Sequence, residues 1–151
     1  VANTLPLVRN MLHVSNIDLR LDTAPDETWV LADTAQMHQV LVNLITNAIQ
    51  SMRPGGELRV ATRGEPGQTA RIVIADNGQG IPPDALPHIF DPFFSTKGTE
   101  GTGLGLSVSY GIVKNHGGRL RVESTVGEGT TCSVELPALS PTEASHGDAT
   151  A

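Results

Sequence analysis

Cysteine is almost absent from this sequence of 151 residues, which contains only Cys132. A disulfide needs two cysteines and a cysteine-based zinc site needs more, so neither can form within this chain. A chain without disulfides is typical of a reducing compartment, and we expect a cytoplasmic location.

Basic residues and long apolar runs are also scarce. Ten lysines and arginines stand against sixteen acidic residues, the net charge is −6, and Lys97 and Lys114 are the only lysines. This charge disfavours a nucleic-acid partner. The sequence has no apolar run of membrane-spanning length and no signal-peptide pattern, which predicts no direct membrane contact from these residues. Because it does not begin with methionine, we expect a piece of a longer protein that can carry a membrane anchor elsewhere.

The remaining composition is that of one globular domain. Hydrophobic residues make up 38% of the chain and charged residues 17%, which is enough apolar side chain for a real core. We expect this domain to span residues 15–137. Ser, Pro, Thr, Gly and Ala dominate beyond Pro137, so residues 138–151 are predicted to form a flexible tail or a linker.

The N-terminal residues 1–14 carry a short helical pattern. Leu5, Val8 and Leu12 recur at helical spacing, and Pro6 fits the first turn of a helix. We interpret this stretch as the end of a helix from a preceding module, although a helix native to this domain fits the same pattern.

The strongest helical periodicity lies in residues 33–52, with Asp33 as the predicted N-cap. Its apolar positions are Met37, Val40, Leu41, Leu44, Ile45, Ala48, Ile49 and Met52. Asn43 and Asn47 lie one turn apart on the edge of this stripe, although asparagine is a poor helix former. Either the two carboxamides have a functional use, or they are simply a pair of amides at the surface or at the edge of the core.

Residues 17–21, 57–63, 119–124 and 131–136 alternate apolar and polar residues, which predicts half-buried strands. Two further short stretches, residues 29–32 and 70–75, are mainly apolar and are also predicted to be strands. Strands with one buried face predict an α/β two-layer sandwich, with a mixed and mostly antiparallel sheet. We expect helices at 33–52 and 103–116, and a shorter one at 82–88, to cover one face of this sheet.

A carboxylate stands where the predicted strand 70–75 ends. Asp76 is followed by Gly78 and Gly80, and glycine allows a ligand to approach the backbone closely. This arrangement is typical of a binding site, although an ordinary Asp-Asn-Gly turn has the same sequence.

All three phenylalanines fall within five residues, at Phe90, Phe93 and Phe94. The residues that follow, up to Gly103, are small or polar. We interpret the two stretches as an aromatic anchor and a mobile lid, with the lid over Ser95–Glu100. A small core cluster followed by a surface loop is the alternative.

Glycines at positions 101, 103 and 105 run directly into a helical pattern formed by Leu104, Val108 and Ile112. A glycine-rich loop that opens a helix exposes backbone N–H groups at the positive end of the helix dipole, which favours anions. The spacing matches neither the Walker pattern nor the dinucleotide-binding pattern. A flexible loop before a core helix is the alternative for this stretch alone.

Together, in this order, these stretches resemble the motifs of the catalytic ATP-binding domain of two-component sensor histidine kinases. This family belongs to a superfamily with gyrase, heat-shock chaperone and mismatch-repair ATPases. The matching stretches are Asn43–Ala48 (N box), Asp76–Ile81 (G1 box), Phe90–Phe94 (F box), Gly101–Leu106 (G2 box) and Gly127–Thr130. The resemblance covers roughly residues 15–137 and implies the Bergerat ATP-binding fold.

The resemblance also implies roles for individual residues. Asp76 would accept a hydrogen bond from the adenine amine, Asn47 would ligate Mg²⁺, and Lys97 would reach the γ-phosphate. Thr130 would bond near Asp76, although the adjacent Thr131 is open as an alternative. The implied ATP-binding residues are Asn43, Asn47, Asp76, Gly78, Gly80, Ile81, Phe93, Lys97, Gly101, Thr102, Gly103, Leu104, Gly105, Leu106 and Thr130, with Asn43, Asn47 and Lys97 also catalytic.

The resemblance favours phosphoryl transfer over hydrolysis. Hydrolytic relatives carry a glutamate base where this sequence has Asn43, and a carboxamide is no general base at neutral pH. None of the five histidines has the surroundings of the family's phosphoacceptor. We therefore expect ATP and ADP as ligands, the histidine-bearing dimerisation domain of the same full-length protein as acceptor, and a response-regulator receiver as a further partner. Residues 1–14 would then be the end of the dimerisation helix, and the isolated domain a monomer.

Other functions are open at this point. A hydrolytic ATPase of the same superfamily and a nucleotide-gated binding module without phosphoryl transfer are the main alternatives. A serine kinase of the anti-sigma type shares the fold and is a weaker third.

Overall fold

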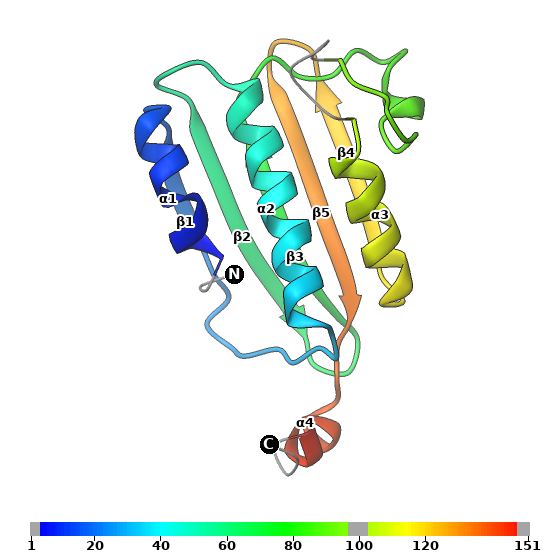
Figure 1. Cartoon of the computed structure of the whole chain (residues 1–151). Coiled ribbons are helices and arrows are strands. Elements are labelled where there is room, and N and C mark those ends of the chain that lie inside the picture. The colour runs from blue at the N-terminus through cyan, green and yellow to red at the C-terminus, as the bar shows by residue number, and fades with distance from the viewer. Residues whose placement is uncertain (1–3, 97–102, 148–151) are drawn as a thin grey trace.

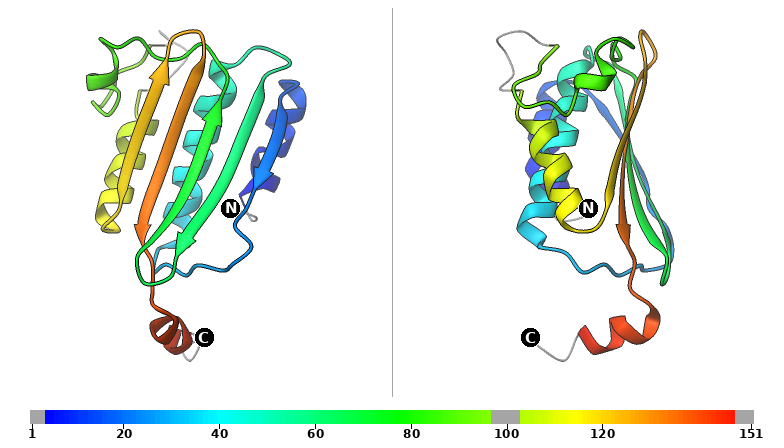
Figure 2. Two further views of the ribbon diagram at one scale, coloured as in Figure 1. Left: turned by 180° about the vertical axis from the view of Figure 1, so that it is seen from behind. Right: turned by 90° about the vertical axis from the view of Figure 1, so that its right-hand side faces the viewer.

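The computed structural model describes residues 4–96 and 103–147 and has two layers, a five-stranded sheet and helices on one of its faces (Figure 1, Figure 2). The elements are α1 (Leu5–Val14), β1 (Asp18–Asp22), α2 (Thr34–Ser51), β2 (Glu57–Glu65), β3 (Thr69–Asp76), the 3₁₀-helix η1 (Leu86–His88), α3 (Gly105–Asn115), β4 (Arg119–Thr125), β5 (Gly129–Pro137) and α4 (Pro141–Gly147). This architecture confirms the predicted fold class.

The sheet has the strand order β1-β2-β3-β5-β4. β1 pairs with β2 in parallel, and the other three pairs are antiparallel, so the sheet is mixed and mostly antiparallel. The register between β3 and β5 sets Asp76 opposite Thr130. The end of β3, where the G1 box begins, therefore lies beside the start of β5.

The core forms between α2 and the inner face of the sheet. Asp33 caps α2 as predicted, because its side chain accepts a hydrogen bond of 2.9 Å from the backbone N–H of Gln36. The buried residues of α2 are Val40, Leu41, Leu44, Ile45, Ala48 and Ile49. They meet Leu58, Val60, Ile74, Val134 and other buried residues of the sheet, which confirms the predicted apolar stripe.

The N-terminal helix α1 packs against this same core. Val8 and Leu12 are buried within it, whereas Leu7 and Val14 on the other side of the helix are exposed. Residues 4–14 are therefore in contact with the domain, and their origin in a preceding module stays a prediction.

The predicted strand over residues 29–32 is wrong, because this stretch pairs with no neighbouring strand. It is an extended connection between β1 and α2, and the carbonyl of Trp29 accepts one hydrogen bond of 2.8 Å from the N–H of Leu139. All four residues are apolar, but Val30 packs toward the core while Trp29 and Leu31 are exposed.

Two further stretches differ from the sequence-based expectation. The helix predicted over residues 82–88 is reduced to the single turn η1. A helix, α4, stands where the sequence predicts a flexible tail, and Ser140 and Glu143 bond to each other at its start as in a capping box. The use of this segment as a linker stays a prediction.

Across the described residues, no helix is both long and apolar enough to cross a membrane. β5 leads into α4 at one end of the sheet, and the described part of the connection from β3 to α3 lies at the other end (Figure 1).

Candidate functional site

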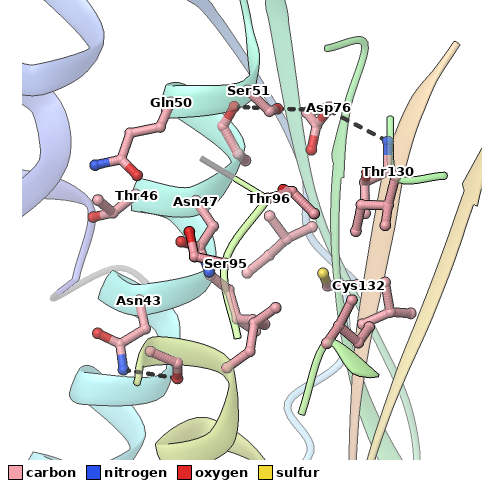
Figure 3. Close-up of a pocket in the computed structure, with 18 of the residues that line it drawn as sticks. Asn43, Thr46, Asn47, Gln50, Ser51, Asp76, Ser95, Thr96, Thr130 and Cys132 are labelled. Atoms are coloured by element: carbon pink, nitrogen blue, oxygen red, sulfur yellow. Dashed lines mark hydrogen bonds between the residues drawn. The ribbon is translucent and has the colours of Figure 1, made fainter. Parts of the chain in front are cut away.

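A pocket of about 350 Å³ opens at the end of the sheet where β3 ends and α3 begins. Figure 3 shows α2 on one side of it and the strands that carry Asp76 and Thr130 on the other. Its lining includes Asn43, Asn47, Asp76, Gly80, Ile81, Gly103, Gly105, Leu106 and Thr130, nine of the residues assigned to ATP binding from the sequence. Segments far apart in the chain thus meet at one cavity.

Asp76 is held by three hydrogen-bond donors on one carboxylate oxygen. Its Oδ1 accepts from the hydroxyl of Ser51 at 3.1 Å and from the N–H of Thr130 at 3.3 Å (Figure 3). The same oxygen accepts from the N–H of Gly78 at 2.9 Å. The donors come from α2, from the turn after β3 and from β5. A charged oxygen bonded in this way has a fixed orientation at the pocket wall.

Thr130, rather than Thr131, is the threonine of this site. Its hydroxyl lies 2.8 Å from that of Ser124, which also accepts a hydrogen bond of 2.7 Å from the N–H of Ile81. This chain of bonds fixes the loop after β3 to the two strands beneath it. Thr131 pairs with Ala75 and does not line the pocket.

The glycines after Asp76 are required by the chain's own packing. A Cβ at Gly78 would collide with the hydroxyl and carbonyl of Ser51, and a Cβ at Gly80 would collide with the carbonyl of Thr125. Gly80 also has a positive φ of 75°, which favours glycine. Gly80 lines the pocket. Gly78 does not line it, but it leaves the room that Ser51 occupies next to the site.

Asn43 and Asn47 face the start of α3 from α2. The Nδ2 of Asn43 lies 3.4 Å from the carbonyl oxygen of Gly105 and 3.3 Å from the hydroxyl of the buried Ser109. A Cβ at Gly105 would stand 3.9 Å from Nδ2 of Asn47. The two carboxamides therefore line the pocket beside the N-terminus of α3, where backbone N–H groups lack helical partners.

The three phenylalanines do not form one cluster. Phe90 stacks near Tyr110 with 4.8 Å between ring centroids, whereas Phe94 lies near His88 and lines the pocket. Phe93 is 76% exposed and is absent from the pocket lining, as is Leu104. Phe90 thus anchors this segment to α3, and the sequence-based assignment of Phe93 and Leu104 to the pocket is not reproduced by the geometry.

The backbone of Phe93 nevertheless fixes the start of the glycine-rich segment. Its N–H donates a hydrogen bond of 3.0 Å to the carbonyl of Gly103. Gly103 has a φ of 68°, and a Cβ there would collide with the backbone of Phe93. Lys97, Gly101 and Thr102 lie outside the described residues, as does most of the predicted lid, whose first residues Ser95 and Thr96 line the pocket.

Sequence reasoning missed several polar residues that line the pocket, and Ser51 and Cys132 are two of them. Ser51 follows Asn43 and Asn47 at the same four-residue spacing, which is a signal visible in the sequence. Cys132 follows Thr130 on the inner face of β5 and sits between Ile74 and Val122 of the neighbouring strands. Burial, together with the charge of Asp76, raises the pKa of the Cys132 thiol to about 12, so the thiol is neutral at pH 7.

The described residues contain no group of three or more His, Cys, Asp or Glu side chains that could hold a metal ion. The polar side chains near the N-terminus of α3 are amides and hydroxyls instead. Such oxygens suit Mg²⁺ when a phosphorylated ligand and water complete its coordination.

Comparison with known proteins shows which family this chain belongs to. The family described as "Histidine kinase-, DNA gyrase B-, and HSP90-like ATPase" matches residues 32–140. The chain is similar to the sensor kinase CckA of Brucella abortus (strain 2308), with 42% identity over 139 residues, which cover 82% of this chain and 15% of that protein. It is also similar to the sensor histidine kinase ZraS of Escherichia coli (strain K12), with 41% identity over 140 residues, 91% of this chain and 29% of that protein. The chain thus spans less than a third of each of these relatives.

Solved structures show the same fold. The nucleotide-free catalytic domain of the histidine kinase ThkA superposes with a TM-score of 0.81 at 32% identity, covering 91% of this chain and 90% of that one. ThkA in complex with the response regulator TrrA gives a TM-score of 0.76 at 28% identity, covering 90% of this chain and 38% of that one. The chain belongs to the family of histidine kinase-, DNA gyrase B- and HSP90-like ATPases, as an ATP-binding catalytic domain of the sensor histidine kinase type.

Proposed function

We propose that this domain binds ATP and Mg²⁺ in the pocket and donates the γ-phosphoryl group to a histidine on the dimerisation domain of the same full-length protein. One observation carries the proposal. The fixed carboxylate of Asp76 and the N-terminus of α3 line the same pocket, with the amides of Asn43 and Asn47 beside that helix end.

The carboxylate of Asp76 selects the base. It accepts a hydrogen bond from the exocyclic amine of adenine, whereas guanine places a carbonyl oxygen at that position and would oppose the negative charge. Three donors already orient the carboxylate, so little ordering is needed when the base binds.

The start of α3 receives the triphosphate. The N–H groups of its first turn lack intrahelical partners and, with the helix dipole, favour anions, and Lys97 in the preceding segment would approach the γ-phosphate. Asn47 would ligate Mg²⁺ through its side-chain oxygen, and Asn43 would assist at the metal or the phosphates. The ion would neutralise charge on the transferring phosphoryl group.

Transfer is favoured over hydrolysis because no general base stands near the amides among the described residues that line the pocket. Asn43 occupies the position at which hydrolytic relatives carry a glutamate, and its amide nitrogen lies within hydrogen-bonding distance of α3. No histidine lines the pocket in the described part of the chain, so the acceptor must come from elsewhere.

A response-regulator receiver is the proposed downstream partner, because the similar kinase ThkA has been solved with the response regulator TrrA. We further propose that the domain works in the cytoplasm and that it is a monomer on its own. Sedimentation of the isolated chain tests the last point.

The test is phosphoryl transfer in trans. The chain is incubated with γ-labelled ATP and Mg²⁺, with and without the dimerisation domain of its full-length protein. We expect label on that domain's histidine, with the acid lability and base stability of a phosphoramidate, and no label on the chain alone. Asn47→Ala should abolish the labelling, whereas Ser145→Ala, on α4, should leave it unchanged.

Two results would contradict the proposal. Rapid ATP turnover by the chain alone, at roughly tens per second, would indicate a hydrolytic ATPase of the same superfamily instead. Tight binding of ATP without transfer to the cognate domain would indicate a nucleotide-gated binding module.

A further inference from the structure

Ser51 is the last residue of α2 and lines the pocket on the face that carries Asn43 and Asn47. These three residues follow one another at intervals of four, so they form a row along the helix toward the end of β3. Asn43 and Asn47 lie beside the start of α3, whereas Ser51 lies beside Asp76 (Figure 3).

Both the backbone and the side chain of Ser51 contact the loop after β3. Its carbonyl accepts a hydrogen bond of 3.1 Å from the N–H of Gln79, and its hydroxyl lies 3.1 Å from Oδ1 of Asp76. Gly78 leaves room for this approach, because a Cβ there would collide with the Ser51 hydroxyl. The end of α2 and this loop therefore pack closely because position 78 is glycine and position 51 carries a small side chain.

The hydroxyl proton of Ser51 has two acceptors within reach. They are the carbonyl oxygen of Ala48 at 2.8 Å and Oδ1 of Asp76 at 3.1 Å. The carboxylate is charged and therefore the stronger acceptor. If the proton pointed to Ala48 alone, two oxygens with unshared electrons would face each other at 3.1 Å beside the negative charge. The arrangement is favourable when the proton is shared with Asp76.

We propose that Ser51 is a positioning residue for base recognition, which holds the Asp76 carboxylate in the orientation that meets the exocyclic amine of adenine. The N–H groups of Gly78 and Thr130 bond the same oxygen from the sheet side, and Ser51 bonds it from the helix layer. The carboxylate is therefore fixed between the two layers of the fold. This inference rests on the proposed ATP site.

The experiment compares two nucleotides that differ only in the group Asp76 reads. Dissociation constants for ATP and for purine riboside triphosphate, which lacks the exocyclic amine, are measured by calorimetry with Mg²⁺. We expect the wild-type chain to prefer ATP. Ser51→Ala should reduce this preference by roughly three- to tenfold through weaker ATP binding, with little change for the analogue.

Two further variants test whether Ser51 changes the nucleotide preference through Asp76. In an Asp76→Asn background, Ser51→Ala should cause almost no further loss of preference, because both changes act on one contact. Ser145→Ala, which removes a serine hydroxyl bonded to a carbonyl of α4, should leave both dissociation constants unchanged. Thermal unfolding without nucleotide identifies any loss of fold.

The outcomes separate the two proposals. If Ser51→Ala weakens both nucleotides equally, or neither, Ser51 does not position Asp76, although the ATP site stands. If the wild-type chain fails to prefer ATP, or keeps that preference in Asp76→Asn, the assignment of adenine to Asp76 is itself wrong.

Discussion

At the scale of single residues, Asp76 joins three of the segments that surround the pocket. Its carboxylate bonds to α2, to the loop after β3 and to β5 through one oxygen. A change at this residue can therefore alter base recognition without altering the backbone, provided that the replacement keeps an oxygen for these donors.

We predict that Asp76→Asn weakens ATP binding by about 1.5–3 kcal/mol, roughly ten- to a hundredfold. The amide keeps one oxygen for the protein donors but loses the charge that attracts the adenine amine. Because the new NH₂ group can donate to the guanine carbonyl, GTP should lose less affinity than ATP. Calorimetry with both nucleotides checks this, and equal losses would show that Asp76 does not read the base.

Cys132 should make stability depend on alkaline pH. Burial raises its pKa to about 12 in the folded chain from an ordinary value near 9, so between these values the unfolded chain releases a proton that the folded chain keeps. Stability is therefore complete below pH 9 and is lost as pH rises toward 12, at up to about 1.4 kcal/mol per pH unit. Urea unfolding of wild type and Cys132→Ala from pH 8 to 11 should give a flatter profile for the variant. Parallel profiles would contradict the buried neutral thiol.

The sequence predicted the family, the amide pair and the strand-end carboxylate, because these residues stand in ordered motifs. It did not predict Ser51 or Cys132 as part of the pocket. Each lies on a predicted inward face, but what it contacts depends on the β3–β5 register and on where α2 ends against Gly78. No local sequence pattern indicates how these segments lie against one another in the folded chain.

At the scale of elements, a backbone contact just before α3 adds to the packing of Phe90 against Tyr110. Gly103 has a φ of 68° and lies directly against the backbone of Phe93. The position of the helix N-terminus, and with it the proposed phosphate site, depends on this contact.

We predict that Gly103→Ala destabilises the fold by more than about 1 kcal/mol and weakens ATP binding, because a Cβ there meets backbone atoms and the φ is unfavourable. Gly111→Ala is the matched control. Gly111 lies inside α3 with open space around a Cβ, so this change should stabilise by about 0.5–1 kcal/mol. Chemical denaturation of both variants checks the pair, and a neutral Gly103→Ala would argue against the contact with Phe93.

Helices and strands were predictable where periodicity and burial agree, and not where a short apolar stretch stays unpaired. The helix α2 and the four antiparallel strands follow their patterns closely. Residues 29–32 are as apolar as a short buried strand, yet they form no strand ladder, although Val30 lines a cavity together with residues of α2. Whether residues 29–32 form a strand depends on the assembled sheet, in which β1 is the edge strand.

At the scale of the whole molecule, α1 is packed as part of the domain. Leu12 is 5% exposed and sits in the core, while Leu7 on the same helix is 62% exposed. Substitutions at these two leucines therefore distinguish the stability contributed by core packing from the stability contributed by helix formation.

We predict that Leu12→Ala lowers the free energy of unfolding by about 2–5 kcal/mol, as for other buried leucines. Leu7→Ala should change it by less than about 0.5 kcal/mol, because the side chain already faces solvent. Urea titration of the two variants makes the comparison. If Leu12→Ala unfolds like the wild type, α1 does not share the core in solution.

The direction of β5 has a consequence for how this molecule can be handled. β5 ends, and α4 follows, at the end of the sheet opposite the pocket (Figure 1). A bulky tag, a surface tether or a fluorescent protein attached beyond α4 would therefore stand clear of the pocket mouth. The domain can be immobilised from that side and titrated with nucleotide, with the attachment out of the ligand's path.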